Sequence, residues 1–268
     1  MRLNALILAA GYGNRLKPLT DFWPKCLMPI NEKPLLQIWL DQLSNLNLET
    51  ILVNTHYFHE EVEAFLNQPK YRNKIIHSFE RDLLGSAGTV RDNNNLFKGS
   101  PLLIIHGDNF TGADLNEFIY AHKNRPKNCV MTMMTFETDC PSSCGIVEVK
   151  DKVVTSFHEK VNNPPSNMAN AAVYIVEKEI LEFIEKNTLI TDFSNEVIPK
   201  FLGKIHTWHN ENYHIDIGTP ENFFLAQTID LETTKAEKTE DQWEYNFRKH
   251  VIHNEIEKLN IELSANNL

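Results

Sequence analysis

Hydrophobic residues in the first half of the chain gather in short runs, which alternate with segments whose apolar residues recur at helical spacing. Short apolar runs bounded by turn residues are typical of buried strands, and the intervening spacing is typical of amphipathic helices. The pattern predicts strands at 3–9, 50–54, 74–79 and 101–105, and helices at 34–46, 60–66, 86–94 and 114–122. This alternation predicts a Rossmann-like α/β fold with a doubly wound, mostly parallel sheet, whose ligands bind beyond the carboxyl ends of the strands.

In the second half of the chain the predicted strands follow one another more closely, so we expect the sheet to become mixed. The pattern predicts strands at 129–136, 145–149, 153–158, 169–176, 205–208 and 213–215, and helices at 178–184, 193–202 and 219–227. These elements complete a first domain over residues 1–228. Residues 229–268 are highly charged and carry apolar side chains such as Trp243 and Phe247 at helical intervals. We expect this tail to form one amphipathic helix or two short ones that cover the body or make a homodimer contact.

Composition and charge narrow the classes of function. With 268 residues, of which 42% are hydrophobic and 23% charged, the chain can bury a sizeable core and has no signature of global disorder. The formal net charge of -10 lacks the basic excess of proteins that coat nucleic acids. No apolar run is long enough to span a bilayer, and the four cysteines lack the paired spacing of a zinc site. We therefore expect a cytoplasmic protein with reduced thiols and no nucleic-acid or membrane partner.

The most informative segment is residues 8–29, LAAGYGNRLKPLTDFWPKCLMP, which directly follows the first predicted strand. Small residues there let the backbone approach a ligand and turn its N–H groups toward phosphate oxygens, and cations further on add positive charge. The small residues are Ala9, Ala10, Gly11 and Gly13, and the cations are Arg15, Lys17 and Lys25; Leu8, at the start of the segment, is also expected to contact the nucleotide. The spacing fits neither the G-x-G-x-x-G of dinucleotide folds nor the G-x-x-x-x-G-K-S/T of Walker loops. This loop indicates a site for a nucleoside triphosphate.

The loop spacing GxGxRLxPLTxxxPKxLxPI resembles that of the sugar-phosphate nucleotidyltransferases, and in particular their mannose-1-phosphate guanylyltransferase-like members. The resemblance covers roughly residues 2–227 and recurs at LGSAG after Glu80, HGD ending at Asp108, CGIVE from Cys144, FHEK ending at Lys160, NAAVY from Asn170 and DIGTP from Asp216. It implies that residues 1–228 form a nucleotidyltransferase catalytic domain. Its implied substrates are a nucleoside triphosphate and a sugar 1-phosphate, and its implied cofactor is Mg²⁺.

The reaction implied by the resemblance is attack of a sugar-phosphate oxygen on the α-phosphorus, with pyrophosphate leaving. Positioning and charge neutralisation are expected to carry such a step. By resemblance, Arg15 clamps the leaving phosphates and Lys25 neutralises charge near the α-phosphate. Asp108 and Asp216 hold Mg²⁺, a hard ion that favours carboxylates together with substrate phosphates. Asp216 has the alternative role of capping the helix after Pro220.

The resemblance also implies a sugar site in the second half of the chain. Lys160 is expected to bind the phosphate of the sugar 1-phosphate, and Glu159 is expected to bind sugar hydroxyls. Gly145 and Asn170 are expected to line the same pocket. Ala172 stands where the family usually has Gly, which is expected to narrow the pocket.

Glu80 and Gly85 belong to the segment that by resemblance binds the base and ribose. A carboxylate can accept both N1–H and N2–H of guanine, whereas uracil and thymine offer one donor between two acceptors. This favours GTP, paired with mannose 1-phosphate or a heptose 1-phosphate. Glu80 has the alternative of facing solvent at the end of a strand.

Three other functions stay open at this point. One is thymidylyl or uridylyl transfer to another hexose 1-phosphate. The second is cytidylyl transfer to a phospho-alcohol such as phosphocholine, which needs an aromatic cage for the quaternary amine. The aromatic residues considered for such a cage are Trp23, Trp39, Trp208 and Tyr174. The third is a non-catalytic sensor of nucleotide-sugars, which would bind nucleotide without releasing pyrophosphate.

Overall fold

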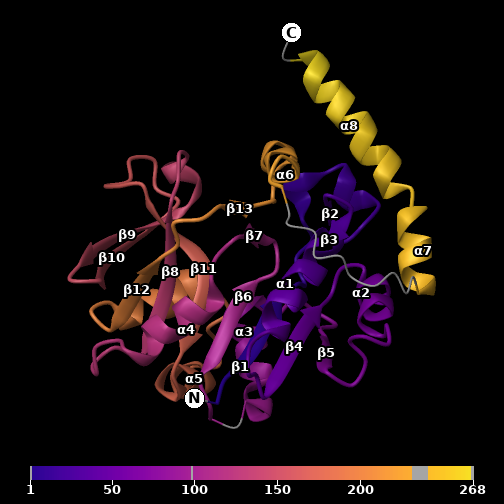
Figure 1. Ribbon diagram of the computed structural model, residues 1–268. Coiled ribbons are helices and arrows are strands. Elements are labelled where there is room, and N and C mark those ends of the chain that lie inside the picture. Colours follow the sequence, from indigo (N-terminus) through magenta and orange to yellow (C-terminus); the bar gives the residue numbers. More distant parts are fainter. Residues whose placement is uncertain (1, 98, 231–240, 267–268) are drawn as a thin grey trace.

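A computed structural model of the chain describes residues 2–97, 99–230 and 241–266 (Figure 1). Its centre is a nine-stranded sheet with the order β5-β4-β1-β6-β11-β8-β12-β10-β9. In that order the strands are Ile75–Phe79, Thr50–Thr55, Asn4–Leu8, Leu102–His106, Met168–Val176, Met131–Glu137, Ile205–His209, Val153–Glu159 and Gly145–Lys150. Each of these strands lies where the hydrophobic pattern predicts one, within about two residues at either end.

The sheet changes character halfway, as the sequence predicts. Strands β5, β4, β1 and β6 are all parallel to one another. Strand β11 then runs antiparallel to both β6 and β8, while β12 is parallel to β8. The fold is therefore a mixed α/β sheet with a parallel half. The carboxyl ends of β1 and β6 meet at one edge, which is where ligands bind in such sheets.

Helices cover both faces of the sheet because β1 alternates its side chains between two hydrophobic cores. Ala5 and Ile7 enter one core and Leu6 enters the other. The first core is covered by α1 (Leu35–Ser44), α2 (His59–Leu66), α4 (Leu115–Lys123) and α6 (Pro220–Gln227). The second is covered by α3 (Gly85–Asp92) and α5 (Lys178–Lys186). A strand buried on both faces reads as a continuous apolar run, which is why β1 was so clear in the sequence.

The helix predicted at 193–202 is present but is not a regular α-helix. The chain instead forms a π-helical turn at Phe193–Val197 and then a 3₁₀ turn at Ile198–Phe201. Pro199 has no N–H to donate and clashes with the preceding turn, so a regular α-helix cannot pass through it. The structure also has two short pairs of strands: β2 (Pro29–Ile30) with β3 (Lys33–Pro34), and β7 (Asn109–Thr111) with β13 (His214–Asp216). Of these four strands, the sequence pattern predicted only β13.

The described part of the tail forms two helices, α7 (Gln242–Arg248) and α8 (Ile252–Asn266). Helix α7 lies on the body: Phe247 packs against Trp23 with a centroid distance of 5.9 Å, and Trp243 lies 4.9 Å from Phe65. Figure 1 shows α8 leading away from α7 toward the C-terminus. A domain boundary at 228 and a dimer contact through the tail stay predictions. None of the helices in the described ranges is both long and apolar enough to cross a membrane.

Candidate active site

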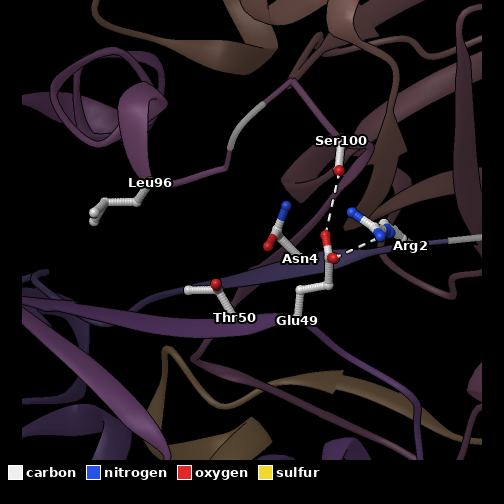
Figure 2. Close-up of a pocket in the computed structure, with 6 residues that line it drawn as sticks. All are labelled: Arg2, Asn4, Glu49, Thr50, Leu96 and Ser100. Atoms are coloured by element: carbon white, nitrogen blue, oxygen red, sulfur yellow. Dashed lines mark hydrogen bonds and ion pairs between the residues drawn. The ribbon is translucent and has the colours of Figure 1, made fainter.

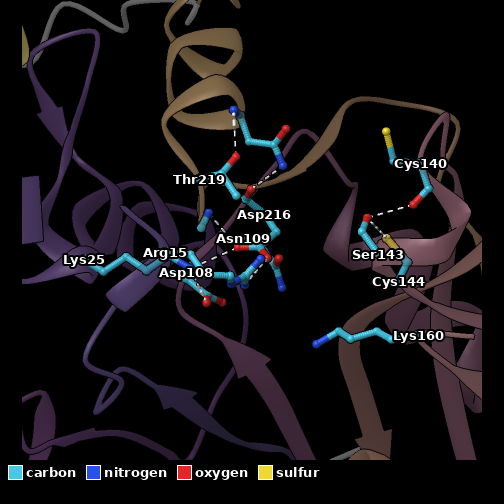
Figure 3. Close-up of polar contacts among 12 residues, drawn as sticks. Arg15, Lys25, Asp108, Asn109, Cys140, Ser143, Cys144, Lys160, Asp216 and Thr219 are labelled. Atoms are coloured by element: carbon cyan, nitrogen blue, oxygen red, sulfur yellow. Dashed lines mark hydrogen bonds and ion pairs between the residues drawn. The ribbon is translucent and has the colours of Figure 1, made fainter. Parts of the chain in front are cut away.

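Four charged side chains from distant parts of the chain meet at the carboxyl edge of the parallel strands. Lys25 Nζ donates to Asp108 Oδ2 at 2.6 Å and to Asp216 Oδ1 at 3.0 Å. Arg15 Nη2 donates to Asp216 Oδ2 at 3.1 Å. Figure 3 shows the four together, with Arg15 and Lys25 reaching the two carboxylates from the loop after β1. The structure thus brings together four residues that the sequence analysis assigned to phosphate and metal binding.

The short strands β7 and β13 explain why the two aspartates lie side by side. They pair antiparallel, with Asn109 opposite Asp216. The backbone N–H of Ile217 also donates to the carbonyl of Asp108 at 3.1 Å. The alternative role of Asp216 as a helix cap does not hold, because Thr219 caps α6 by accepting from Asn222 N–H.

Lys25 is only 8% exposed, and its charge is compensated by the two carboxylates that it contacts. Burial alone lowers the pKa of Lys25, but the charges of Asp108 and Asp216 and the hydrogen bonds to them outweigh it, so the pKa is raised. Burial alone would raise the pKa of Asp108, but the charges of Lys25 and His106 and hydrogen bonds from Lys25 and the backbone lower it to about 2. Both groups are therefore charged at neutral pH, and a phosphate would meet a cation already held in place.

The glycine loop offers its backbone to a ligand. A Cβ added at Gly11 would meet nothing within 4 Å, so the backbone there is accessible. Gly13 has φ +67, and a Cβ there would lie 2.7 Å from Thr20 Cγ2, so glycine is required for local packing. Ala10 is buried, and Leu8 ends β1, where its carbonyl accepts from Gly107 N–H at 2.9 Å. Lys17 pairs with Asp21 at 2.9 Å and takes no part in the cluster.

One observation supports a divalent-cation site at Asp108 and Asp216. Their oxygens already converge on a single cationic atom, Lys25 Nζ. Within the described residues there is no group of three or more His, Cys, Asp and Glu that could hold a metal by itself. Two carboxylates completed by phosphate oxygens are what Mg²⁺ favours, so the donor set fits that ion when a triphosphate is bound.

The expected sugar residues come from a hairpin on the other side of the site. Strands β9 and β10 pair so that Gly145 lies opposite Glu159. A Cβ at Gly145 would lie 2.6 Å from Glu159 Oε2, so glycine leaves room for that carboxylate. Lys160 forms an ion pair with Glu159 at 3.5 Å and is 60% exposed. Figure 3 shows its side chain directed toward the aspartates from the side opposite Lys25.

Asn170 shapes the backbone next to this hairpin. Its Nδ2 donates to Tyr174 Oη at 2.6 Å, and its Oδ1 accepts from Ala172 N–H at 3.0 Å. The β11–β8 register shifts between Asn170 and Tyr174, and Ala172 at the centre of the irregularity has φ +53. Glycine adopts this left-handed conformation more readily than alanine, which fits the resemblance-based expectation of glycine at this position.

Glu80 lies apart from the charged cluster and is only 4% exposed, so the solvent-facing alternative is wrong. Its Oε1 accepts from Asn54 Nδ2 at 2.8 Å and from the Thr89 hydroxyl. Its Oε2 accepts from Leu84 N–H at 3.2 Å. Three internal donors already engage this carboxylate, which leaves little capacity for a two-bond contact with guanine. The neighbouring Gly85 has φ +74 and packs against the carbonyl of Thr191.

Sequence reasoning assigned no role to two residues that hold the site. Gly218 packs so tightly that a Cβ would lie 2.8 Å from Arg15 Nη2 and from Asp216 Oδ1. Asn222 Nδ2 donates to the carbonyl of Asp216 at 2.9 Å. The DIGTP motif carried a signal for Gly218, whereas nothing local marks Asn222. A pocket of about 380 Å³ around Arg2, Asn4 and Glu49 lies at the opposite end of β1 and is unconnected with these residues (Figure 2).

Proteins similar to this chain in sequence are named as sugar 1-phosphate nucleotidyltransferases. A D-glycero-alpha-D-manno-heptose 1-phosphate guanylyltransferase from Aneurinibacillus thermoaerophilus is 28% identical over 232 residues, which are 84% of this chain and 97% of the relative. A mannose-1-phosphate guanylyltransferase from Mycobacterium tuberculosis is 26% identical over 227 residues, 83% of this chain and 63% of the relative. The chain spans a little under two thirds of the length of several such relatives.

A solved structure, HddC from Yersinia pseudotuberculosis, superposes with a TM-score of 0.71 at 26% identity, covering 85% of this chain and 99% of that one. The same protein has been solved in complex with GMP-PN. The family model described as nucleotidyl transferase matches residues 4–233, which include the glycine loop and all four members of the charged cluster. This chain therefore belongs to the nucleotidyl transferase family.

Proposed function

We propose that the chain transfers a nucleotidyl group from a nucleoside triphosphate to a sugar 1-phosphate and releases pyrophosphate. The observation that carries this proposal is the cluster of Arg15, Lys25, Asp108 and Asp216 beside an accessible glycine loop. Two cations held in place by two carboxylates suit a reaction in which negative charge moves between phosphate oxygens.

In this mechanism the sugar-phosphate oxygen attacks the α-phosphorus, its new P–O bond forms, and the bond to the leaving pyrophosphate breaks. The attacking oxygen is already an anion near neutral pH, so the protein needs no strong base. Arg15, whose side chain is 60% exposed, binds the leaving phosphates, and Lys25 neutralises charge at the α-phosphate. Lys160 approaches from the opposite side and orients the phosphate of the acceptor.

We propose Mg²⁺ as the cofactor, with Asp108 and Asp216 as its protein ligands. When bound, Mg²⁺ would supply charge neutralisation and orientation of the triphosphate oxygens. Lys25 then serves the phosphates as well as the carboxylates, because its ammonium has three donors.

We propose GTP as the nucleotide and mannose 1-phosphate or a heptose 1-phosphate as the acceptor. The support comes from relatives named for guanylyl transfer to these two sugars and from the likeness to HddC, solved with GMP-PN. Uridylyl transfer is the second candidate, because a UTP–glucose-1-phosphate uridylyltransferase from Synechocystis is 28% identical over 258 residues. The internal hydrogen bonds of Glu80 weaken the argument for guanine from that side chain alone.

The phosphocholine alternative finds no support in the aromatic residues considered for a cage. Trp23, Trp39 and Tyr174 are 6%, 1% and 0% exposed, and Trp208 packs against Phe118. A quaternary amine therefore has no exposed ring face to contact at Trp23, Trp39 or Tyr174, and Trp208 alone, which is partly buried, does not make a cage. We also propose that the protein works in the cytoplasm, which agrees with four cysteines that are all free.

The experiment is pyrophosphate release with Mg²⁺, measured for GTP, dTTP, UTP, CTP and ATP against mannose, heptose and glucose 1-phosphates and phosphocholine. We expect release with GTP and one sugar 1-phosphate. Release with another nucleotide would correct the base and keep the reaction. Nucleotide binding without release for any pair would favour the non-catalytic sensor.

A further inference from the structure

Asn54 joins the glycine loop to the segment after β5 through one buried side chain. It lies near the carboxyl end of β4, opposite Leu8 of β1, and is 2% exposed. Its Oδ1 accepts from the backbone N–H of Ala9 at 2.8 Å, in the glycine loop. Its Nδ2 donates to Glu80 Oε1 at 2.8 Å, in the base segment. A single amide thus uses both its acceptor and its donors to connect two loops from different strands.

The contact continues into helix α3. Asn54 Nδ2 also lies 3.1 Å from Thr89 Oγ1, and that hydroxyl donates to Glu80 Oε1. Thr89 Oγ1 lies 3.0 Å from the carbonyl of Gly85, at the start of the helix. Glu80 in turn accepts from Leu84 N–H. The side chains of Asn54, Glu80 and Thr89 therefore fix the backbone of the base segment relative to the glycine loop.

We infer that Asn54 is a positioning residue that holds the glycine loop and the base segment at a fixed separation, so that triphosphate and base bind as one rigid unit. The inference rests on the proposed function, because it takes residues 80–88 as the base segment. A ligand that spans two segments gains affinity when their separation is set beforehand, since binding need not order them. In this arrangement the backbone of residues 80–88, which the network holds in place, contacts the base. The carboxylate of Glu80 is then free to serve the network through its internal hydrogen bonds.

The chain offers a matched control at the other end of the same strand pair. Asn4 lies on β1 opposite Thr50 of β4, is 1% exposed, and donates through Nδ2 to the carbonyl of Phe97 at 2.9 Å. It lines the pocket of Figure 2, at the edge of the sheet away from the glycine loop. Asn4→Ala and Asn54→Ala each remove a buried amide and leave a backbone partner unpaired. Asn54→Ala also removes bonds to Glu80 and Thr89, so it should cost more folding stability, and the comparison between the two variants rests on the ratio of the two probe affinities within each variant.

The experiment measures dissociation constants with Mg²⁺ for two probes, inorganic tripolyphosphate and the nucleoside triphosphate that the wild type binds most tightly. Tripolyphosphate engages only the glycine loop and its cations, whereas the nucleotide engages both segments. For Asn54→Ala we expect the affinity for the nucleotide to fall about tenfold more than the affinity for tripolyphosphate. For Asn4→Ala we expect the two affinities to change by the same small factor.

Thr89→Val is the second variant, in case Asn54→Ala folds poorly. It keeps the bond between Asn54 and Ala9 and removes the hydroxyl that contacts Glu80, Asn54 and the Gly85 carbonyl, so it should weaken nucleotide binding while tripolyphosphate binding stays within about twofold. Equal losses for both probes, or no loss for either, would overturn the inference. So would an Asn4→Ala variant that behaves as Asn54→Ala does. These measurements need no turnover, so a failure of the proposed reaction would show separately as absent pyrophosphate release by the wild type.

Discussion

The ammonium of Lys25 lies 2.6 Å from Asp108 Oδ2, and this ion pair joins the loop after β1 to the end of β6. Strands β1 and β6, after which the two residues lie, are adjacent and parallel in the sheet. Lys25 is nearly buried, so its position is set by packing as well as by charge. The pair therefore offers the most direct test of the proposed site.

We expect Lys25→Met to reduce turnover by about 10²–10³-fold, because a fixed cation at the reacting phosphate is lost. Methionine keeps much of the length and apolar volume of lysine, so the fold should persist. The measurement is kcat for pyrophosphate release together with a circular dichroism spectrum. Lys33→Met is the control, since Lys33 forms an ion pair with Asp41 away from the cluster and should leave kcat unchanged. Near-normal turnover of Lys25→Met would show that the reacting phosphate lies elsewhere.

The same variant tests whether Asp108 and Asp216 bind a divalent cation. Without the Lys25 ammonium the two carboxylates repel each other, and Mg²⁺ bound between them should stabilise the variant more than the wild type. We expect added MgCl₂ to raise the thermal midpoint of Lys25→Met by about 2–4 °C more than that of the wild type. NaCl at matched ionic strength separates binding from screening. The assignment of these aspartates fails if both salts act alike, or if Lys25→Met/Asp216→Asn responds as strongly as Lys25→Met.

Much of this arrangement could be predicted because its signals are local in the sequence. Strand β1 is an apolar run, and the glycine loop follows it at once. Asp108 follows β6 in the same way. In a parallel sheet the carboxyl ends of such strands share one edge, so their meeting follows from the pattern.

Other features could not be predicted because they depend on contacts between distant residues. Lys25 and Asp216 are 191 positions apart and meet through the three-residue pairing of β7 with β13, which is too short to give a periodic signal. Glu80 follows β5 as an exposed residue would, yet Asn54 and Thr89 from other elements bury it. The positive φ of Ala172 is imposed by the irregular pairing of β11 with β8, since alanine itself favours negative φ.

That conformation leads to a prediction about stability. Ala172 has φ +53, which costs a residue with a Cβ about 1–2 kcal/mol, so Ala172→Gly should raise the free energy of unfolding by up to about 1 kcal/mol. Ala171 is the control: it is 1% exposed and lies beside Ala172 in β11 without a positive φ. Ala171→Gly should lower the free energy of unfolding by about 0.5–1 kcal/mol. Urea denaturation measures both, and a loss of stability in both variants would show that the left-handed backbone carries no strain.

His122 should make the protein sensitive to mild acid. Its side chain is fully buried, with Nδ1 2.8 Å from Thr132 Oγ1 and Nε2 3.3 Å from Glu177 Oε1. Burial, followed by the charges of Arg125 and His206, lowers the pKa of His122 to about 3. Below an ordinary histidine pKa of about 6.5 the unfolded chain therefore binds a proton that the folded chain does not. The stability is fully present above pH 6.5 and is lost as the pH falls toward 3.

The test compares the free energy of unfolding at pH 7 and pH 5 for the wild type and His122→Gln. When the unfolded chain binds one proton more than the folded chain, the free energy of unfolding falls by about 1.4 kcal/mol for each unit that the pH decreases. His122 should therefore account for about 2 kcal/mol of the loss between pH 7 and pH 5. Glutamine keeps a polar group in the site but does not titrate, so the variant should lose about 2 kcal/mol less than the wild type. Other histidines with lowered pKa values contribute equally to both proteins and cancel in the difference. Identical losses would mean that His122 is protonated in the folded state.

Lys160 tests the acceptor side of the site independently of the nucleotide side. It is 60% exposed, is directed toward the aspartates in Figure 3, and is held at the end of the hairpin by its backbone N–H, which donates to the carbonyl of Cys144 at 3.1 Å. A hydrogen bond from a cation to phosphate contributes about 1.5–3 kcal/mol. Lys160→Ala should therefore raise the KM for the sugar 1-phosphate about 10-fold to 100-fold, with little change in the KM for the nucleotide.

Lys150→Ala provides the comparison, because Lys150 ends β9 on the same hairpin at the opposite end from Gly145. It removes an equal charge from the same surface, so a general loss of electrostatic attraction would affect both variants alike. An increase in KM confined to Lys160→Ala would place the acceptor phosphate beside this side chain. If the KM for the nucleotide rose instead, Lys160 would belong to the triphosphate site, and the acceptor would have to enter from another side of the aspartates.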